Sequence, residues 1–428
     1  MAQYSNGERM LARVLSAFPG LKKFLKRVYQ YLNYALHNKR DSFSSDFDLV
    51  ATAHSQDRET FFGYYDTSPL NKDGDKVIYH ITTHRTTKAP DPNYPVDIAV
   101  QDWRSGDTTI VASTTAYNWQ QGAKLQWLTN TRFVYNTTDQ RTGGYCAEIY
   151  DTNQKQITDI LPFPIYDCHR DEYALSLNYD RLAEYAPDYG YTRMLPAVFK
   201  DCHDTDGLFV IDLKAKTHKL LTSLTTIIAM DPASSMTDAK HSVNHIMISP
   251  NGGTFMFIHR WYHKGVRFDR LIVGNRSGTT FKIVADGGMV SHCFWEDDST
   301  IVSYMRHEGT DGYYRINVIS DGLDVQPLAK DVLTGRGDGH PNIKGHRLVT
   351  DTYPDKARMK GLMMLNTDTN ALINLGQFFE SFKYYEVTRC DLHPRLDPTG
   401  NIVFFDSVHS GTRALYHINL TRSESCAS

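Results

Sequence analysis

Apolar side chains recur at helical spacing over residues 10–36, in two stripes separated by Pro19-Gly20. This spacing is typical of an amphipathic helix, and the Pro-Gly pair predicts a break within it. The face opposite the second stripe is basic, with Lys22, Lys23, Lys26 and Arg27. The pattern therefore predicts a basic amphipathic helical extension, which we place at residues 1–44.

From residue 60 onward the pattern changes to short β-rich runs separated by polar turns. One layout recurs: a polar residue or histidine, a short strand, a turn, and a second apolar strand. Seven copies begin near residues 67, 124, 166, 245, 292, 340 and 393, with a mean spacing of roughly 54 residues that is close to the period of four-stranded propeller blades. We therefore predict an all-β fold, a seven-bladed β-propeller over residues 45–428. Six or eight blades stay open as alternatives, because the third unit is long and irregular.

The last copy ends one strand short of a complete blade. The segment DFDLVAT at residues 46–52 has the composition of the missing strand. Pairing it with the last copy would close the ring and remove exposed sheet edges. We expect this segment to complete the seventh blade.

Four consecutive copies open with a histidine at the same position: His245, His292, His340 and His393. In a propeller the first strand of each blade starts at one face of the central channel. Equivalent residues therefore form a ring around the axis. Neutral imidazoles arranged in this way suit a divalent metal or general-base chemistry. The alternative is that they join neighbouring blades through hydrogen bonds.

The same face should also receive the ends of the second strands. These ends carry His80, Arg260 and Arg306, and Trp261 directly follows Arg260. Arginine side chains bind carboxylates through paired hydrogen bonds, and aromatic faces suit sugar rings. Asp351 and Asp406 end strands on this rim too, so the paired carboxylates of a glycoside hydrolase remain an alternative.

Composition narrows the class of protein. Of 428 residues, 41% are hydrophobic and 22% are charged, which is enough apolar material for a sizeable core. The net charge of -3 gives no footprint of nucleic-acid binding. The six cysteines are scattered, without a CxxC pair. We see no secretory signal, and we expect a cytoplasmic protein.

Charge is unevenly distributed along the chain. Residues 1–40 contain eight basic residues and Glu8, a balance of +7, so the other residues carry -10. A basic amphipathic helix can lie on an anionic membrane surface. The alternative is that residues 10–36 dock on the protein's own body or on a partner. The expected location is therefore the cytoplasm, peripheral to the inner membrane where the helix meets lipid.

Several motifs resemble a known family. They are RCDLHPRLDPTGNIVFFDSVHSGTRALYHINL (389–420), VSHCFW (290–295), DGHPNIKGHRLVTDTYPD (338–355) and VNHIMISPNGGTFMFIHRW (243–261). They resemble oligogalacturonate-lyase-like proteins. Together they look more like relatives of rhamnose–glucuronate lyases, including uncharacterised proteins from bacterial surface-polysaccharide clusters. The resemblance runs from about residue 54 to 420. It implies a seven-bladed propeller with an axial metal and β-elimination at a uronic acid.

The resemblance also implies roles for individual residues. His245 matches the base position, and His292 and His393 match metal ligands, with His340 at the equivalent place in its own blade. The metal would be manganese or calcium. The remaining implied roles are carboxylate binding by Arg181, Arg260 and Arg389, proton donation by Tyr191, and a rival base site at His80 and His84. The family pattern is not matched at the last blade, where Arg389 and Arg395 stand near His393.

These observations predict a polysaccharide lyase-like enzyme of bacterial surface-polysaccharide metabolism. The C5 proton of a uronic acid is weakly acidic, so its removal needs a base and a cation on the adjacent carboxylate. The expected partner is a uronate-containing oligo- or polysaccharide. The alternatives are a non-catalytic propeller that binds glycan or protein in an assembly complex, and a glycoside hydrolase or transferase.

Overall fold

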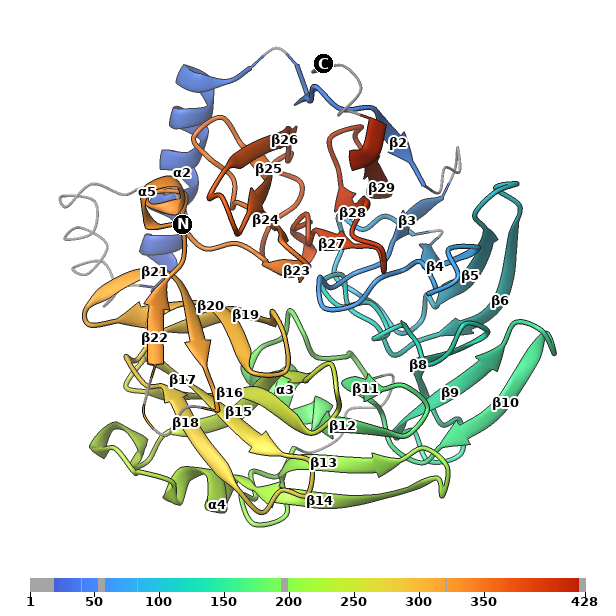
Figure 1. Cartoon of the computed structure of the whole chain (residues 1–428), viewed down its shortest axis with the longest axis vertical. Coiled ribbons are helices and arrows are strands. Elements are labelled where there is room, and N and C mark those ends of the chain that lie inside the picture. Colours follow the sequence, from blue (N-terminus) through green and yellow to red (C-terminus); the bar gives the residue numbers. More distant parts are fainter. Residues whose placement is uncertain are drawn as a thin grey trace.

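The strands form seven antiparallel sheets arranged as blades around a central axis (Figure 1). This computed structural model describes residues 19–39, 41–52, 58–82, 84–193, 199–319, 322 and 324–422. In each sheet the first strand lies nearest the axis and later strands follow outward, except where the two ends of the chain meet. The predicted seven-bladed β-propeller is confirmed, and the six- and eight-bladed alternatives are wrong.

The first four blades follow the chain in order. Blade 1 contains β3 (Glu59–Phe61), β4 (Lys76–Thr82), β5 (Val96–Asp102) and β6 (Thr108–Thr114). Blade 2 contains β7 (Gln126–Trp127), β8 (Arg132–Thr138), β9 (Tyr145–Asp151) and β10 (Gln156–Leu161). Blade 3 contains β11 (Asp167–His169), β12 (Tyr173–Leu177), β13 (Gly207–Asp212) and β14 (Thr217–Ser223). Blade 4 contains β15 (Lys240–Ile248), β16 (Thr254–His263), β17 (Val266–Asn275) and β18 (Phe281–Ala285).

Blades 5 to 7 complete the ring. Blade 5 contains β19 (Val290–Trp295), β20 (Thr300–His307), β21 (Thr310–Asn317) and β22 (Asp324–Pro327). Blade 6 contains β23 (Asn342–Lys344), β24 (Arg347–Asp351), β25 (Met359–Asn366) and β26 (Leu372–Phe379), to which β1 (Phe43–Ser44) adds a fifth strand. Blade 7 contains β27 (Arg395–Leu396), β28 (Ile402–Ser407), β29 (Ala414–Asn419) and β2 (Leu49–Ala51).

The seventh blade joins the two ends of the chain. Leu49 of β2 pairs with Ile418 of β29, and Ala51 pairs with Tyr416, in antiparallel register. The predicted closing strand is therefore confirmed. Upstream of it, Phe43 pairs with Phe378, so the end of the predicted extension already forms part of a blade.

The third unit is irregular because 178–206 intervenes between its second and third strands. Helix α3 (Tyr179–Tyr185) lies in this insertion, and the side chain of Asn178 caps it by accepting from the backbone N–H groups of Asp180 and Arg181. The other short helices connect strands. They are α4 (Leu224–Ala229), η2 (Ser234–Met236), α5 (Lys330–Leu333) and η3 (Glu386–Thr388); a further one, η4 (Leu420–Arg422), follows the last strand, β29.

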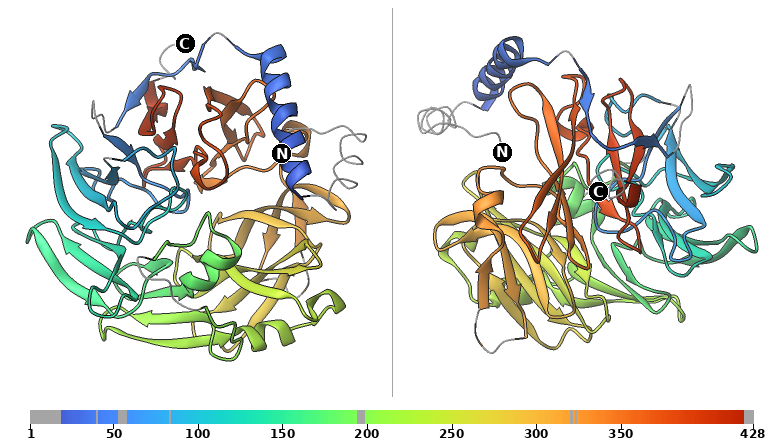
Figure 2. Two further views of the ribbon diagram at one scale, coloured as in Figure 1. Left: turned by 180° about the vertical axis from the view of Figure 1, so that it is seen from behind. Right: turned by 45° about the horizontal axis from the view of Figure 1, so that its top comes forward.

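Helix α2 (Pro19–His37) lies outside the ring, against blade 6 (Figure 2). It begins at Pro19, where the sequence predicted a break, and proline suits the first turn of a helix. The first predicted stripe, over residues 10–18, lies outside the described residues. None of the described helices has the length and apolar character needed to cross a membrane.

Candidate active site at the propeller axis

The backbone directs side chains toward the axis where the inner strands are irregular. Lys124, His245 and His393, near the inner strands of blades 2, 4 and 7, have left-handed backbone with φ of 52°, 53° and 46°. In blade 4 the pairing of β15 with β16 shifts register between Asn244 and Met247. Non-glycine residues rarely adopt this conformation unless their surroundings hold them there. The amide of His245 is held by Asn244 Oδ1 at 2.7 Å and by Tyr166 Oη at 3.2 Å.

The four predicted histidines meet at the axis. The ring centroids of His245 and His292 are 5.4 Å apart. Those of His292 and His340 are 4.0 Å apart, and those of His340 and His393 are 4.3 Å apart. All four side chains are buried. The structure therefore brings together the histidines that the repeat had placed at one position.

Hydrogen bonds at Nδ1 determine which ring nitrogen of two histidines is available. His340 donates from Nδ1 to Asp351 Oδ1 at 2.7 Å, and His393 donates from Nδ1 to the carbonyl oxygen of Gly63 at 2.9 Å. Carboxylate and carbonyl oxygens only accept, so Nδ1 carries the hydrogen in both rings. In the neutral rings Nε2 then has a free lone pair. Both Nε2 atoms are buried without a hydrogen-bond partner among the described residues.

Gly63 is suited to its place in this arrangement. It has φ of +117°, and a Cβ atom there would lie 2.7 Å from the carbonyl carbon of Gln121. Its carbonyl oxygen also accepts from Nη1 of Arg395 at 2.8 Å. A side chain at this position would displace the acceptor that orients His393.

A buried His–Asp–His group has the composition of a metal site. The group consists of His340, Asp391 and His393. Each residue offers one ligand atom, and the three atoms lie within 4.8 Å of one another. Burial alone would raise the pKa of Asp391, but Arg389 and Lys360 hold that pKa well below its usual range. Two imidazole nitrogens and a carboxylate suit manganese better than calcium, which prefers oxygen ligands throughout.

The charge around this group favours a bound cation. Burial works against a charge on His340, but Asp351 and more distant carboxylates outweigh it and raise the pKa of the imidazole. The carboxylates thus stabilise positive charge at this position. A divalent metal would take the place of the proton on the ring.

His292 lies beside the His–Asp–His group, with its ring centroid 4.0 Å from that of His340. Its Nδ1 is 3.2 Å from Asp338 Oδ1, and Asp338 also accepts from Ser291 Oγ at 2.6 Å. The resemblance implied a ligand role for His292, and that role stays a prediction. The group of three also contains Asp391, which the sequence analysis did not name. The Asp-x-His spacing of Asp338 and Asp391 before His340 and His393 is a sequence signal that could have pointed to both carboxylates.

His245 is neutral and has one ring nitrogen without a partner. Its Nε2 shares a hydrogen bond of 2.6 Å with Tyr64 Oη, and its Nδ1 is buried with no described partner. Burial lowers the pKa of His245 well below its usual value, and the nearby His292 and Arg260 lower it further. When Nε2 carries the hydrogen and donates it to Tyr64, Nδ1 has the lone pair that a general base needs. No pattern in the sequence singled out Tyr64.

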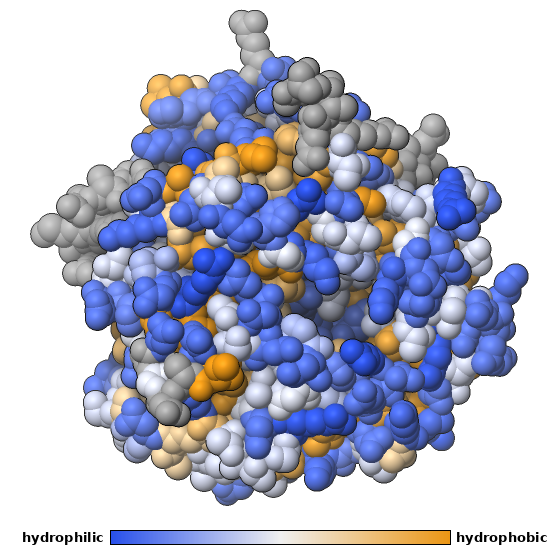
Figure 3. Space-filling view, in the orientation of Figure 1, coloured by the Kyte–Doolittle hydropathy of each residue, from blue (hydrophilic) through white to orange (hydrophobic). Residues whose placement is uncertain are grey.

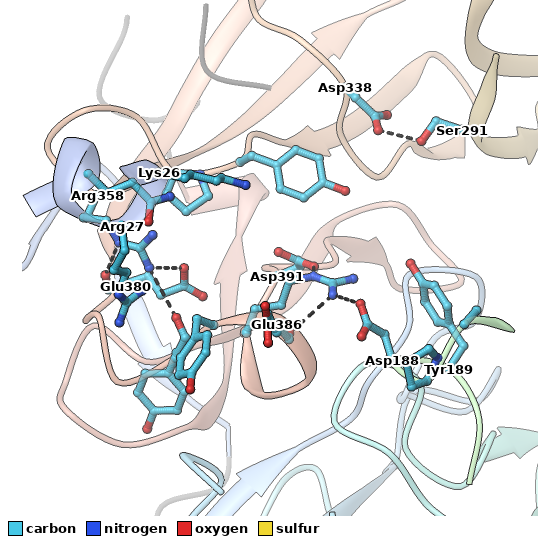
Figure 4. A pocket seen from close by; sticks show the side chains of 18 of the residues that line it. Lys26, Arg27, Asp188, Tyr189, Ser291, Asp338, Arg358, Glu380, Glu386 and Asp391 are labelled. Atoms are coloured by element: carbon cyan, nitrogen blue, oxygen red, sulfur yellow. Dashed lines mark hydrogen bonds and ion pairs between the residues drawn. The ribbon is translucent and has the colours of Figure 1, made fainter. Parts of the chain in front are cut away.

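A cleft of about 1200 Å³ leads to these residues (Figure 4). Its inner end contains His245, His292, Asp338, Asp391 and Tyr189, and α2 forms part of its outer wall. Arg389 lies between the carboxylates of Asp188 and Asp391, and its guanidinium donates to both. The cleft thus combines two of the axial histidines, His245 and His292, with a rim that carries both basic and acidic side chains.

Two of the predicted arginines lie in the cleft. Arg260 lines it and is paired with Asp269 behind it, and Arg389 lines it beside Asp391. Arg181 lies elsewhere, buried between Asp206 and Asp201 at 2.6 and 2.7 Å.

Arg306 and Trp261 do not line the cleft either. Arg306 is exposed on blade 5 and pairs with Asp311 at 2.7 Å. Trp261 is buried against Phe268, with ring centroids 5.5 Å apart, and its indole N–H donates to Ser235 Oγ at 3.1 Å. The contacts of Arg306 therefore lie within blade 5, and those of Trp261 lie in and next to blade 4, outside the cleft.

Tyr191 and His80 are also engaged outside the cleft. Tyr191 stacks on Tyr179 at 4.4 Å, and its hydroxyl accepts from Asn136 at 2.9 Å. His80 donates to the carbonyl oxygen of Phe61 at 3.3 Å and accepts from the amide of Ala123 at 3.1 Å. The ring of His80 therefore has no free nitrogen for a substrate proton. Burial lowers the pKa of His80 to about 4.

Comparison with known proteins supports the fold and leaves the family open. No protein-family model and no curated protein matches the sequence. Among similar solved structures is an oligogalacturonate lyase in complex with manganese, 16% identical with a TM-score of 0.61, covering 90% of this chain and 96% of that one. Another is an oligogalacturonate lyase from Vibrio parahaemolyticus, 14% identical with a TM-score of 0.58, covering 89% and 97%. At such identities the likeness shows the fold alone, so family membership stays a prediction.

Proposed function

We propose that this protein is a metal-dependent lyase that cleaves a uronic-acid-containing glycan by β-elimination. One observation carries the proposal: His340 and His393 present unpaired Nε2 atoms next to Asp391, close to the neutral His245. A fold shared with a manganese-bound oligogalacturonate lyase supports it.

His340, Asp391 and His393 would hold the metal, and a bound divalent cation supplies neutralisation of the substrate carboxylate. His245 takes the C5 proton at Nδ1, while Tyr64 holds the ring through Nε2. The C5–H electrons form the C4=C5 double bond as the C4–O4 bond breaks. Tyr189 lines the cleft with its ring 5.7 Å from that of His245, and we assign it the proton that O4 takes up.

The cleft suits a chain of sugars better than a single one. Its volume of about 1200 Å³ exceeds the roughly 300–1,000 Å³ of sites for drug-sized ligands. Basic side chains occur from the inner end to the outer wall, at Arg389, Arg260, Lys356 and Lys26. Carboxylates such as Asp355 and Glu386 line the cleft between them. The basic groups would bind the carboxylates of an acidic oligosaccharide of several units, and the acidic groups would accept from its hydroxyls. Its place in surface-polysaccharide metabolism is part of the same proposal.

The test is an assay for the unsaturated product. Purified protein is incubated with oligosaccharides of different uronic acids, with manganese or with chelator, and the ultraviolet absorbance of the new double bond is followed. We expect activity that needs metal and falls about 10²–10⁴-fold in His245→Gln. His346→Gln, an exposed histidine outside the cleft, is the matched control. Activity that survives in His245→Gln would overturn the assignment of the base.

A second function is favoured by the cations around Asp391. Arg389 Nε lies 2.7 Å from Asp391 Oδ2, and Lys360 Nζ lies 3.4 Å from Oδ1, so protein groups already neutralise this carboxylate. Under this alternative the cleft binds an acidic glycan without cleaving it. Calorimetric binding of uronate oligosaccharides with no product and no metal requirement would favour it.

A further inference from the structure

One side of helix α2 is fixed to blade 6. Arg27 donates to the carbonyl oxygen of Phe382 at 2.7 Å, and its guanidinium lies 4.8 Å from the ring centroid of Tyr385. Tyr31 stacks on Phe382 with centroids 4.1 Å apart, and Tyr34 meets the same ring edge-on at 5.5 Å. These contacts define the orientation of the helix on the propeller.

A second side of α2 is polar and faces the cleft. Lys26, Gln30 and Asn33 recur three or four residues apart and all line the outer wall. Figure 4 shows Lys26 on α2 at the edge of the pocket. This side is therefore available to a ligand in the cleft.

The remaining side is apolar and uncovered. Phe24, Val28, Leu32 and Leu36 follow one another at intervals of four residues, and 65%, 38%, 61% and 80% of their surfaces are exposed. Phe24, the first of them, also borders the outer wall of the cleft. Leu25 lies next to this stripe and is 39% exposed. Figure 3 shows hydrophobic surface at the upper left, where Figure 1 places α2. A continuous exposed stripe of large apolar side chains marks an interaction surface.

We propose that this stripe, made of Phe24, Leu25, Val28, Leu32 and Leu36, binds the surface of an anionic membrane. The chain around it has the complementary charge, because residues 1–40 carry +7 while the rest of the chain carries -10. Basic residues near a membrane surface are attracted to anionic lipid. Apolar side chains of this kind insert between headgroups when the helix lies in the plane of the surface.

Charge also decides between lipid and a second copy of the chain. Pairing two α2 stripes would bring two segments of charge +7 together, which opposes association. A membrane-bound α2 would have its polar side and the cleft beside the lipid surface. The cleft would then receive acidic glycan close to a membrane. Lipid binding itself does not depend on the proposed lyase activity.

The experiment measures co-sedimentation of the full chain with lipid vesicles. Vesicles of phosphatidylcholine alone are compared with vesicles that also contain phosphatidylglycerol, at low and high salt. We expect binding to the anionic vesicles, weakened by salt. The key variants are Leu32→Glu on the apolar stripe and Asn33→Glu on the cleft side, because both make the same change in charge.

Leu32→Glu should bind at least tenfold more weakly than Asn33→Glu, since only the first removes an apolar side chain from the membrane contact. Leu32→Ser, which adds no charge, should also bind more weakly than the unmodified chain. Equal binding of the two glutamate variants, or no binding to anionic vesicles, would overturn the proposal. So would a dimer in light scattering that Leu32→Glu dissociates, because a second copy would then cover the stripe.

Discussion

Side chains at the axis show how one hydrogen bond can define the chemistry of a neighbouring atom. Asp351 accepts from Nδ1 of His340 and also from the backbone amides of His340 and His393. It therefore orients two proposed ligands without belonging to the metal-binding group. A carboxylate that accepts from the second nitrogen of a metal-binding imidazole orients the ring and increases its basicity.

Asp351→Asn should weaken manganese binding about 10–100-fold, because the amide keeps one accepting oxygen while its nitrogen cannot accept from the N–H group that the second carboxylate oxygen holds. Titration of manganese by calorimetry would measure the effect. The control is the same change of Asp to Asn at Asp311, which forms an exposed ion pair on blade 5, and this variant should bind manganese normally. Asp406 would not serve as a control, because it accepts from the amides of Phe62 and Gly63 next to the site.

Buried neutral histidines away from the axis should make stability depend on pH. Burial lowers the pKa of His80 and of His409 to about 4. In the unfolded chain these groups take up protons near pH 6.5, before the folded protein does. The free energy of unfolding should therefore fall as pH decreases from about 6.5 to 4, by up to about 1.4 kcal/mol per pH unit for each histidine.

His409→Phe isolates one of these contributions. The ring of His409 lies among Phe43, Phe378 and Tyr416, so phenylalanine preserves the aromatic packing while removing the titrating group. Urea midpoints measured between pH 4 and 7 should depend less steeply on pH in this variant. An unchanged slope would contradict the prediction.

At the scale of single residues, the sequence predicted part of the site. The repeat aligned four histidines because strand order alone brings equivalent positions to the axis. It did not identify Tyr64, because its contact with His245 joins residues 181 positions apart. Nor could it distinguish Arg389, in the cleft, from Arg181, whose partners Asp201 and Asp206 become apparent only when the insertion in blade 3 folds.

Among the elements, β2 is short yet completes a blade. Leu49 and Ala51 are partly buried against the apolar cluster of blades 6 and 7, whereas Val50 points outward and is 44% exposed. This alternation is that of a strand with one covered face. The two faces of β2 should therefore respond differently to a charge.

Leu49→Asp should lower the free energy of unfolding by about 1–3 kcal/mol, because it places a carboxylate on the covered face. Val50→Asp is the matched control and should change it by less than about 0.5 kcal/mol. Chemical unfolding followed by tryptophan fluorescence would compare them. Similar values for both would mean that β2 contributes little to closure.

The sequence predicted most elements because apolar alternation and turn residues recur in each blade. The closing strand was found for a different reason: the last blade lacked a strand and 46–52 had the right pattern. The pairing of β1 with β26 was not predicted, because two residues carry no periodic signal. Helix α3 was also missed within the irregular third unit.

For the whole molecule, the proposed metal site draws its three residues from the starts of blades 6 and 7. His340 precedes β23, and Asp391 and His393 precede β27. A metal held by all three would bind the folded protein and not the unfolded chain. Binding would therefore stabilise the ring as a whole.

Manganese at 100 times its dissociation constant should add about 2.7 kcal/mol to the free energy of unfolding, and chelator should remove this gain. The thermal midpoint, followed by scanning calorimetry with and without manganese, measures it. His393→Ala should abolish the metal-dependent shift, whereas His346→Gln should retain it. A midpoint that manganese leaves unchanged would contradict metal binding at the axis.

The pairing of β2 with β29 has a consequence for the order of events during protein synthesis. About 360 residues separate these strands, so β2 leaves the ribosome long before its partner exists. At 5–20 residues per second this interval lasts roughly 20–70 s. An almost equally long interval passes between the synthesis of helix α2 and that of Phe379 and Phe382, its contacts in blade 6. The earliest part of the chain is therefore among the last to reach its native contacts, and in that interval a nascent-chain chaperone or a lipid surface can bind it first.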